Sequence, residues 1–227
     1  MKRTFFNSKG KDKQYIVIGC GRFGSSVAKK MCQLGNEVMV IDKDEDSIEN
    51  IAEQVTHTAI VDVTEERDLK SIGLGNFDVV IVAISSDIRA SIMATIMAKE
   101  MGVPKIVCKA KDELQAKVLY KIGADKVVFP ERDMGIRLAY NLASENILDQ
   151  INLDPEYSIM EIVTPTNWVG KTIIELNLRA KYDITVLAVK TPSGLKVMPS
   201  PNYKMQEKNI LIIIGNTDKI SDIILHD

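Results

Sequence analysis

Histidine and cysteine are both scarce in this chain of 227 residues. Only His57 and His226 are present, and because histidine is the commonest general acid or base near neutral pH, the sequence offers little proton-transfer chemistry. The three cysteines, Cys20, Cys32 and Cys108, are too widely separated for a CxxC metal site or a disulfide framework. We therefore expect reduced thiols in a cytoplasmic protein.

Long apolar runs and a strong net charge are also missing. The runs at 79–84 and 210–214 are far shorter than the roughly 20 residues of a membrane-spanning helix. Residues 1–13 are basic but lack the apolar core of a signal peptide, so we expect a mobile N-terminus. A net charge of −2 and a pI of about 5.8 predict no general attraction for nucleic acid or anionic lipid.

A glycine-rich fingerprint follows the first apolar segment, at 15–18. Gly19, Gly21 and Gly24 have the GxGxxG spacing: the first allows a tight turn, the second lets a pyrophosphate approach, and the third lets a helix pack closely on the strand. The phosphates would lie at the N-terminus of that helix, where free N–H groups and the helix dipole favour anions. The pattern predicts a nucleotide site.

An acid follows this fingerprint at the expected distance. Asp42 ends the second predicted strand, 18 residues after Gly24. There a carboxylate can accept hydrogen bonds from both ribose hydroxyls and would repel a 2′-phosphate. The sequence thus favours NAD(H) or another adenine nucleotide over NADP(H).

Strands and helices alternate regularly through the first 150 residues. Continuous apolar strands that alternate with helices predict an α/β domain, a doubly wound parallel sheet of the Rossmann type. The expected strands are 15–18, 37–41, 58–61, 78–84, 105–109 and 126–129, and the expected helices are 23–34, 44–53, 65–71, 87–101, 111–121 and 132–150.

The turn-forming segment 152–155 marks the expected domain boundary. We therefore divide the chain into a basic N-terminus at 1–13, a Rossmann domain with a crossover helix at 14–150, and a small α+β domain at 151–227. In the last domain the expected strands are 157–163, 184–190, 195–198 and 209–214, with helices at 171–176 and from Asp218. A domain of this size has little core of its own and is expected to pair with a copy of itself.

Two further patterns in the sequence do not predict a ligand site. Gly170, Lys171 and Thr172 resemble the end of a P-loop, but Pro165 replaces the required glycine, so we reject that interpretation. Methionines 93, 97 and 101 recur at a spacing of four, which indicates either a packed core or a subunit interface.

Seven segments together cover nearly the whole chain in the order of one known family. They read IVIGCGRFG at 16–24, VIDKDED at 40–46, AIVDVTEERDLKSIG at 59–73, VVIVAISSD at 79–87, IVCKAKD at 106–112, KIGADKVVFPERDMGIRLA at 121–139 and VGKTIIELNLRAKYDITVLAVK at 169–190. These segments resemble the RCK (regulator of potassium conductance) family, and in particular the cytosolic regulatory subunits of Ktr- and Trk-type potassium transporters.

The resemblance implies a nucleotide-sensing subunit, not an enzyme. Its Rossmann domain would bind ATP, ADP or NAD(H), and its homodimers would form an octameric ring at the inner face of the membrane, under a potassium-channel subunit of the KtrB or TrkH type. The ring would open or close the channel according to the bound nucleotide. Carried over by position, the nucleotide-binding residues are Gly19, Gly21, Arg22, Phe23, Gly24, Asp42, Lys43, Asp62, Val63, Ala83, Ile84, Ser85, Lys109, Ala110 and Glu131.

Simpler roles remain open for several of these side chains. Arg22 and Lys109 could be solvated charges, and Asp62 could cap the helix that follows it. By resemblance, Glu131 would approach the phosphates or a bound cation such as Mg²⁺, although it could also simply favour a helix N-terminus.

The family also includes members that bind cyclic di-AMP between two C-terminal domains. Arg179, Ile184, Thr185 and Pro199 occupy positions that resemble the contacting ones. Asp183 stands where many relatives carry glycine, and its carboxylate would repel an anionic ligand. Two other functions compete with the regulatory one: an NAD-dependent dehydrogenase, and a free-standing nucleotide-sensing module with a different partner.

Overall fold

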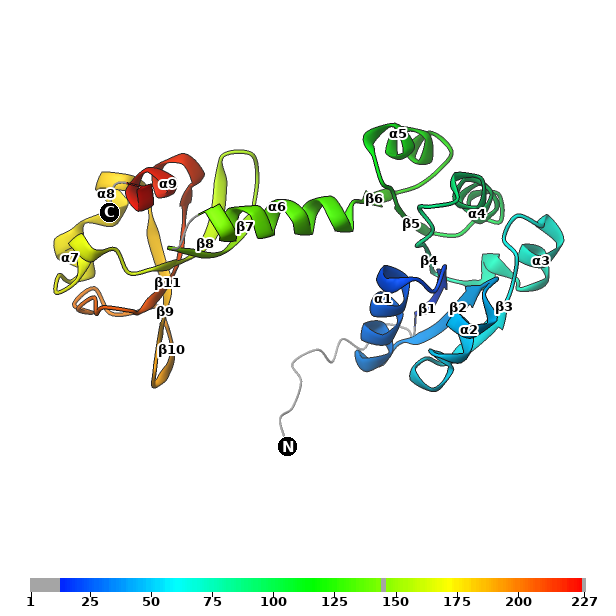
Figure 1. The fold of residues 1–227 in the computed structure, drawn as a ribbon, viewed down its shortest axis with the longest axis horizontal. Coiled ribbons are helices and arrows are strands. Elements are labelled where there is room, and N and C mark those ends of the chain that lie inside the picture. Colours follow the sequence, from blue (N-terminus) through cyan, green and yellow to red (C-terminus); the bar gives the residue numbers. More distant parts are fainter. Residues whose placement is uncertain (1–12, 144–145, 226–227) are drawn as a thin grey trace. The chain divides into compact units, whose positions relative to one another are not determined.

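The computed structural model describes residues 13–143 and 146–225, which fall into two compact units (Figure 1). The division by contacts lies between Arg132 and Asp133, inside helix α6 (Pro130–Ala143), whereas we expected a boundary after residue 150. The N-terminal segment expected to be mobile lies, apart from Lys13, outside the described residues, as does His226.

The N-terminal unit contains the predicted doubly wound sheet. Six strands pair in the order β3-β2-β1-β4-β5-β6, and every neighbouring pair is parallel. The strands are β1 (Gln14–Ile18), β2 (Glu37–Asp42), β3 (His57–Ile60), β4 (Val79–Val82), β5 (Lys105–Lys109) and β6 (Lys126–Val128). The helices are α1 (Arg22–Gln33), α2 (Glu45–Glu49), α3 (Glu66–Ser71), α4 (Ile88–Glu100) and α5 (Glu113–Lys121), with single 3-10 turns at Ala52–Gln54 and Leu74–Asn76.

Both faces of this sheet are buried, as the continuous apolar strands require. On β1, Ile16 and Ile18 pack into a core with residues of α3, α4 and α5, whereas Val17 packs into a second core with residues of α1 and α2. Met97 belongs to the first core and Met101 packs against it. These two methionines therefore pack in the interior of the unit, so for them the structure supports a packed core and not a subunit interface.

The C-terminal unit is built on a smaller antiparallel sheet, as predicted for an α+β domain. Its strand order is β10-β9-β11-β8-β7, and helices α7 (Ile173–Leu176), α8 (Leu178–Tyr182) and α9 (Thr217–Leu225) accompany it, with a 3-10 turn at Thr166–Trp168. The strands are β7 (Ile147–Asn152), β8 (Tyr157–Val163), β9 (Thr185–Thr191), β10 (Gly194–Val197) and β11 (Ile210–Asn216). Trp168, Met160 and Ile213 are among the residues of its core.

One expected helix was wrong in its second half. We expected a helix over 132–150, but α6 ends at Ala143 and Ile147–Asn152 form strand β7. This segment pairs antiparallel with β8, which supplies backbone hydrogen bonds and buries Ile147 against the C-terminal core. The polar segment 152–155 is consequently the turn of the β7–β8 hairpin, where the Asp154 carboxylate accepts hydrogen bonds from the N–H groups of Glu156 and Tyr157.

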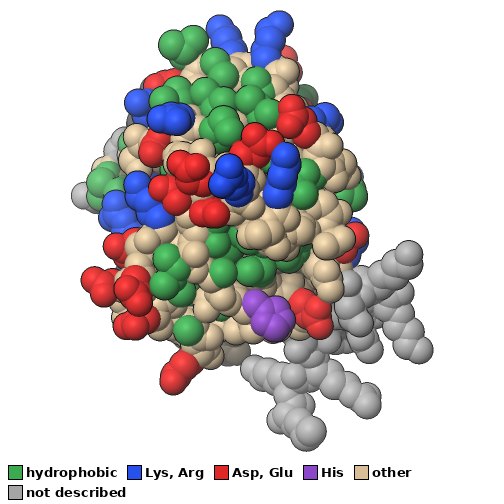
Figure 2. All heavy atoms as spheres, turned by 90° about the vertical axis from the view of Figure 1, so that its right-hand side faces the viewer, with side chains coloured by type: hydrophobic (Ala, Val, Ile, Leu, Met, Phe, Trp, Pro, Cys, Tyr) green, Lys and Arg blue, Asp and Glu red, His purple; other side chains and the backbone are tan. Residues whose placement is uncertain are grey.

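The surface carries charges of both signs. Figure 2 shows acidic and basic side chains interspersed on one face, with apolar side chains between them. Within residues 13–143 and 146–225, no helix is long and apolar enough to cross a bilayer.

Candidate functional site

The turn after β1 is shaped by two glycines that leave no room for a side chain. Gly19 has a φ of +102°, and a Cβ there would lie 2.9 Å from Cγ1 of Ile84. A Cβ on Gly24 would lie 1.9 Å from the carbonyl oxygen of Gly19, because α1 packs directly on the turn. A Cβ on Gly21, by contrast, would meet no atom within 4 Å. The first and third glycines are thus needed for packing, and the second leaves open space beside the turn.

Asp42 at the end of β2 is held against this turn by backbone hydrogen bonds. Its Oδ2 accepts from the Cys20 N–H at 2.6 Å, and its Oδ1 accepts from the Asp44 N–H at 3.0 Å. Each carboxylate oxygen retains acceptor capacity, so both hydroxyls of a ribose could still bind. Burial first, and then the charge of Asp42, raise the pKa of the Cys20 thiol, and its S–H donates to the Ser47 carbonyl at 3.3 Å.

A cavity of about 480 Å³ opens at the carboxyl ends of the strands in the N-terminal unit, which is where open α/β sheets bind ligands. Of the predicted site residues, all except Phe23, Gly24 and Ala110 line it. Gly24 is taken up by helix packing, and Ala110 is buried beneath the surface. Sequence reasoning missed the residues Ile18, Ile41, Val61, Ser86, Asp87 and Ala90, which also line the cavity.

Three of the missed residues belong to the start of α4. The Asp87 carboxylate caps this helix by accepting from the Ala90 N–H at 3.0 Å. The sequence did carry a signal for this cap, because Asp87 comes five residues after the end of β4, directly after Ser85 and Ser86, and aspartate is a favoured helix N-cap residue. The other three are apolar residues at or just beyond the ends of β1, β2 and β3.

Two basic side chains, Arg22 and Lys109, line the cavity on the side of α1. Arg22 is the first residue of α1, and Nζ of Lys109 lies 2.6 Å from Oε1 of Glu131. The Lys109 ammonium also lies 5.9 Å from the centre of the Phe23 ring, which places Phe23 under the cation and outside the cavity lining. The hydrogen bond from Lys109 is the main cause that lowers the pKa of the Glu131 carboxyl. Glu131 therefore enters the site as a carboxylate already engaged by a cation.

Asp62 does not cap the helix that follows it, contrary to one expectation. The cap residue of α3 is Glu65. Asp62 instead closes a tight turn in which its Oδ1 accepts from the N–H and the hydroxyl of Thr64, at 2.9 and 2.8 Å. These two hydrogen bonds, the backbone one first, lower the pKa of the Asp62 carboxyl.

Two potentially reactive side chains, those of His57 and Cys108, are not among the residues that line the cavity. His57 begins β3, at the opposite end of the strand from the site, and its side chain is exposed. Burial raises the pKa of the Cys108 thiol to about 11, so it stays protonated. Within the described part of the chain, no group of three or more His, Cys, Asp or Glu side chains is arranged to hold a metal ion.

A second cavity, of about 470 Å³, lies in the C-terminal unit. Arg179, Ile184, Thr185 and Pro199 all line it, so the structure brings together the four positions singled out there. Asp183, whose carboxylate was expected to repel an anion, forms an ion pair with Lys219 and does not line this cavity. Asp183 would therefore repel an anion in this cavity less than its position in the sequence suggested.

Two protein-family models match the chain: the TrkA-N domain over residues 15–130 and the TrkA-C domain over residues 158–224. The chain is 45% identical to Ktr system potassium uptake protein C and 42% identical to Ktr system potassium uptake protein A, both from Bacillus subtilis (strain 168). Each alignment covers 92% of this chain and 95% of the relative. Among solved structures, the GsuK channel bound to NAD is similar over 95% of this chain and 39% of that longer chain, with a TM-score of 0.66 and 17% identity.

Proposed function

This chain belongs to the TrkA-N and TrkA-C family that includes the Ktr potassium uptake proteins A and C, and from that premise we propose that it is the nucleotide-sensing regulatory subunit of a potassium uptake system. An adenine nucleotide, ATP, ADP or NAD(H), binds in the N-terminal unit. Its identity sets whether a membrane potassium-channel subunit, of the KtrB or TrkH type, conducts. The protein works in the cytoplasm, at the inner face of the membrane, through this partner.

The orientation of Asp42 is the observation that carries the nucleotide assignment. Its carboxylate is fixed by two backbone N–H groups, at 2.6 and 3.0 Å, directly beside the glycine turn, and Asp42 lines the same cavity as Gly19 and Gly21 of that turn. A ribose bound to Asp42 would direct its phosphates to the N-terminus of α1, next to Arg22. Support also comes from the similarly folded GsuK channel, whose structure was solved with NAD.

Glu131 and Lys109 indicate how the phosphate end distinguishes nucleotides. The Glu131 carboxylate is bonded to Lys109 and also senses the charge of Arg22, so all three groups share one electrostatic environment. A third phosphate would be attracted by the two cations and repelled by Glu131. A divalent cation such as Mg²⁺, held by this carboxylate together with the phosphates, would remove that repulsion, and one carboxylate is a sufficient protein contribution when phosphates complete the shell.

The dehydrogenase alternative finds little support in the cavity. No histidine is among the described residues that line it, and the acids there are already engaged: Asp42 and Asp62 in turns, Asp87 in a helix cap, and Glu131 with Lys109. A hydride-transfer enzyme would need a group placed to move a proton at the substrate. We therefore assign binding, and no chemistry, to this site.

The crossover helix α6 supplies a surface for a second copy of the chain. Met134, Leu138 and Leu142 recur at a spacing of four, which places them on one face of the helix, and they are 60%, 54% and 77% exposed. Apolar side chains left in water on one helix face mark an association surface. We assign it to a homodimer, which by family resemblance assembles further into an octameric ring.

The Arg179 cavity is assigned to cyclic di-AMP. It combines the guanidinium of Arg179 with the apolar walls of Ile184, Val186 and Pro199, a composition suited to a phosphodiester with flat bases. The Arg179→Ala variant should lose binding of this ligand, whereas ATP binding in the N-terminal unit should be unchanged. A null titration of the folded, dimeric wild-type protein would remove this assignment and leave the nucleotide assignment intact.

Four measurements test the proposed function. Calorimetry with ATP, ADP, NAD⁺ and NADH should give saturable binding for at least one of them, and co-expression with the membrane subunit should yield a stable complex. Light scattering should show a mass well above the 25.3 kDa of one chain. A monomer that binds none of the four ligands would contradict the proposal, and turnover of NADH with hydroxy or keto acids would favour the dehydrogenase.

A further inference from the structure

We propose that a hollow beside Trp168 and Tyr182 in the C-terminal unit is a binding site for a small organic anion with an aromatic or apolar body. The hollow has a volume of about 550 Å³ and is lined by residues 167, 168, 170, 171, 175, 176, 181 and 182. An adjoining hollow of about 400 Å³ shares Asn167, Trp168, Lys181 and Tyr182 with it. We call the two together the Trp168 pocket. It shares no residue with the Arg179 cavity.

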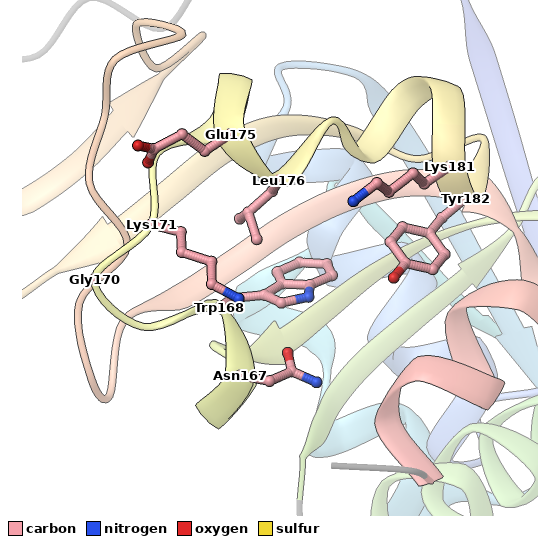
Figure 3. A pocket seen from close by; sticks show the side chains of 8 residues that line it. All are labelled: Asn167, Trp168, Gly170, Lys171, Glu175, Leu176, Lys181 and Tyr182. Atoms are coloured by element: carbon pink, nitrogen blue, oxygen red, sulfur yellow. The ribbon is translucent and has the colours of Figure 1, made fainter.

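The walls of the Trp168 pocket combine polar side chains with three apolar or aromatic ones, Trp168, Leu176 and Tyr182. Trp168 and Leu176 belong to the core of the unit, and the ring of Tyr182 packs against the same core. Figure 3 shows the indole at the base of the hollow, with Leu176 above it and the Tyr182 ring to one side. These groups offer a ligand one flat and one aliphatic surface, which is the usual composition of a small-molecule site.

Two lysines of the pocket are available to contact an anion. Lys171 precedes α7 and Lys181 lies on α8, and within the described residues neither ammonium forms an ion pair. Figure 3 shows both side chains extending toward the space around Trp168 and Leu176. Glu175 also lines the hollow; it accepts from the N–H and the hydroxyl of Thr172, at 2.7 and 2.8 Å, in a capping box, and in the described part of the chain it forms no ion pair with either lysine.

The remaining charges of the pocket are also accounted for. Lys219 lines the adjoining hollow but is paired with Asp183, and Asp222 lies on that same side. Lys171 and Lys181 then stand against Glu175 and Asp222 in the lining, so the formal charges balance, and among residues 13–143 and 146–225 the two lysines are the lining cations that no ion pair engages. Because no described residue holds Lys171 or Lys181 in an ion pair, either ammonium group can turn to contact a bound anion, and the protein that replaces part of the surrounding water strengthens that contact.

The backbone at Gly170, Lys171 and Thr172 narrows the class of anion. In a P-loop these N–H groups would surround a phosphate, but here they donate to Met205, Trp168 and Glu175, respectively. A bare phosphate finds no backbone cradle in this hollow. Recognition would rest on the two ammonium groups, with the Tyr182 hydroxyl as a further polar contact, and on burial of the ligand's apolar body. This combination selects an aromatic or branched carboxylate over inorganic phosphate.

Trp168 is the only tryptophan in the chain, so its fluorescence reports directly on this pocket. We would titrate the full-length protein with phenylacetate, and in parallel with acetate and with inorganic phosphate at the same ionic strength. Phenylacetate should change the emission saturably, and the other two should not, since they lack the apolar body or the carboxylate. None of these probes absorbs appreciably where tryptophan is excited.

Substitutions of Lys171 and Lys181 test whether the fluorescence change depends on these two lysines. Lys171→Ala and Lys181→Ala should each weaken phenylacetate binding about tenfold, as expected for the loss of one charge-assisted contact. Lys196→Ala is the matched control, because Lys196 is on β10 of the same unit and lines neither hollow; it should bind like the wild type. Circular dichroism verifies that each variant is folded.

Three results would overturn the proposal. One is an unchanged emission with phenylacetate when equilibrium dialysis also detects no binding. A second is equal affinity for phenylacetate, acetate and phosphate, which would show only screening of the lysines. The third is a saturable response to an acidic peptide but not to phenylacetate, which would make the pocket a protein-docking surface. None of these results bears on the nucleotide site.

Discussion

Replacing Asp42 by alanine should separate ribose recognition from the rest of nucleotide binding. Each carboxylate oxygen already accepts one backbone hydrogen bond, from Cys20 and Asp44, and has one further lone pair for a ribose hydroxyl. A hydrogen bond to a charged acceptor contributes about 1.5–3 kcal/mol, so Asp42→Ala should weaken NAD⁺ or ADP binding roughly tenfold to a hundredfold.

The same substitution should act in the opposite direction on a 2′-phosphorylated nucleotide. In the wild type the Asp42 carboxylate repels the 2′-phosphate of NADP⁺, and this repulsion disappears in Asp42→Ala. Calorimetry should therefore show weaker NAD⁺ binding and stronger NADP⁺ binding. Glu49→Ala is the matched control, because it removes an exposed carboxylate from α2 that does not line the cavity, and it should alter neither affinity.

A loss of protein stability would also weaken NAD⁺ binding in Asp42→Ala, and the comparison with NADP⁺ distinguishes the two causes. Asp42→Ala leaves the nearly buried Cys20 N–H without its acceptor, which costs about 1–3 kcal/mol of unfolding free energy. A collapsed turn would weaken NAD⁺ and NADP⁺ binding alike. Equal losses for both ligands, or an unchanged NAD⁺ affinity, would refute the assignment of Asp42 to the ribose.

Two further predictions follow from the glycine turn and from the turn after β3. Gly24→Ala should destabilise the protein by about 2 kcal/mol or more, because its Cβ would lie 1.9 Å from the Gly19 carbonyl oxygen, and thermal unfolding should show a lower Tm. Gly21→Ala should keep the wild-type Tm but weaken nucleotide binding, since its Cβ meets only open space beside the turn; the same Tm in both variants would contradict this account. Thr64→Val should raise the pKa of Asp62 toward its ordinary value, because it removes one of the two hydrogen bonds to the carboxylate. A depressed pKa contributes stability above the unfolded value near 3.9 and loses it as the pH falls through the folded value, so the variant should lose this contribution at a higher pH; an NMR titration with an unmoved Asp62 pKa would contradict the assignment.

Local patterns predicted the Rossmann unit well because its elements are specified by short segments. The positive φ of Gly19 and the close contact of Gly24 are requirements of the turn itself, so the local sequence is enough to predict them. Asp42 ends a strand whose own residues already predict a strand. The general rule that ligands bind at the carboxyl ends of parallel strands then placed most of the cavity.

The features that were missed depend on partners distant in sequence. The segment Ile147–Asn152 becomes an edge strand because β8 is there to pair with it, which no local window reveals. Lys109 meets Glu131 across 22 residues, and Phe23 lies under that lysine and not on the cavity wall. Spacing alone could place these side chains near the site but could not give their direction.

Potassium flux through vesicles that contain the membrane subunit and this protein tests the central claim most directly. Arg22 begins α1 and its charge acts on Glu131, so a γ-phosphate at this position would be the group that distinguishes ATP from ADP. We predict different flux with saturating ATP and ADP, a smaller difference for Arg22→Ala with ADP affinity largely intact, and an unchanged difference for Arg67→Ala, which removes an exposed arginine of α3 outside the cavity. Equal flux with ATP and ADP in the wild-type complex would contradict the account.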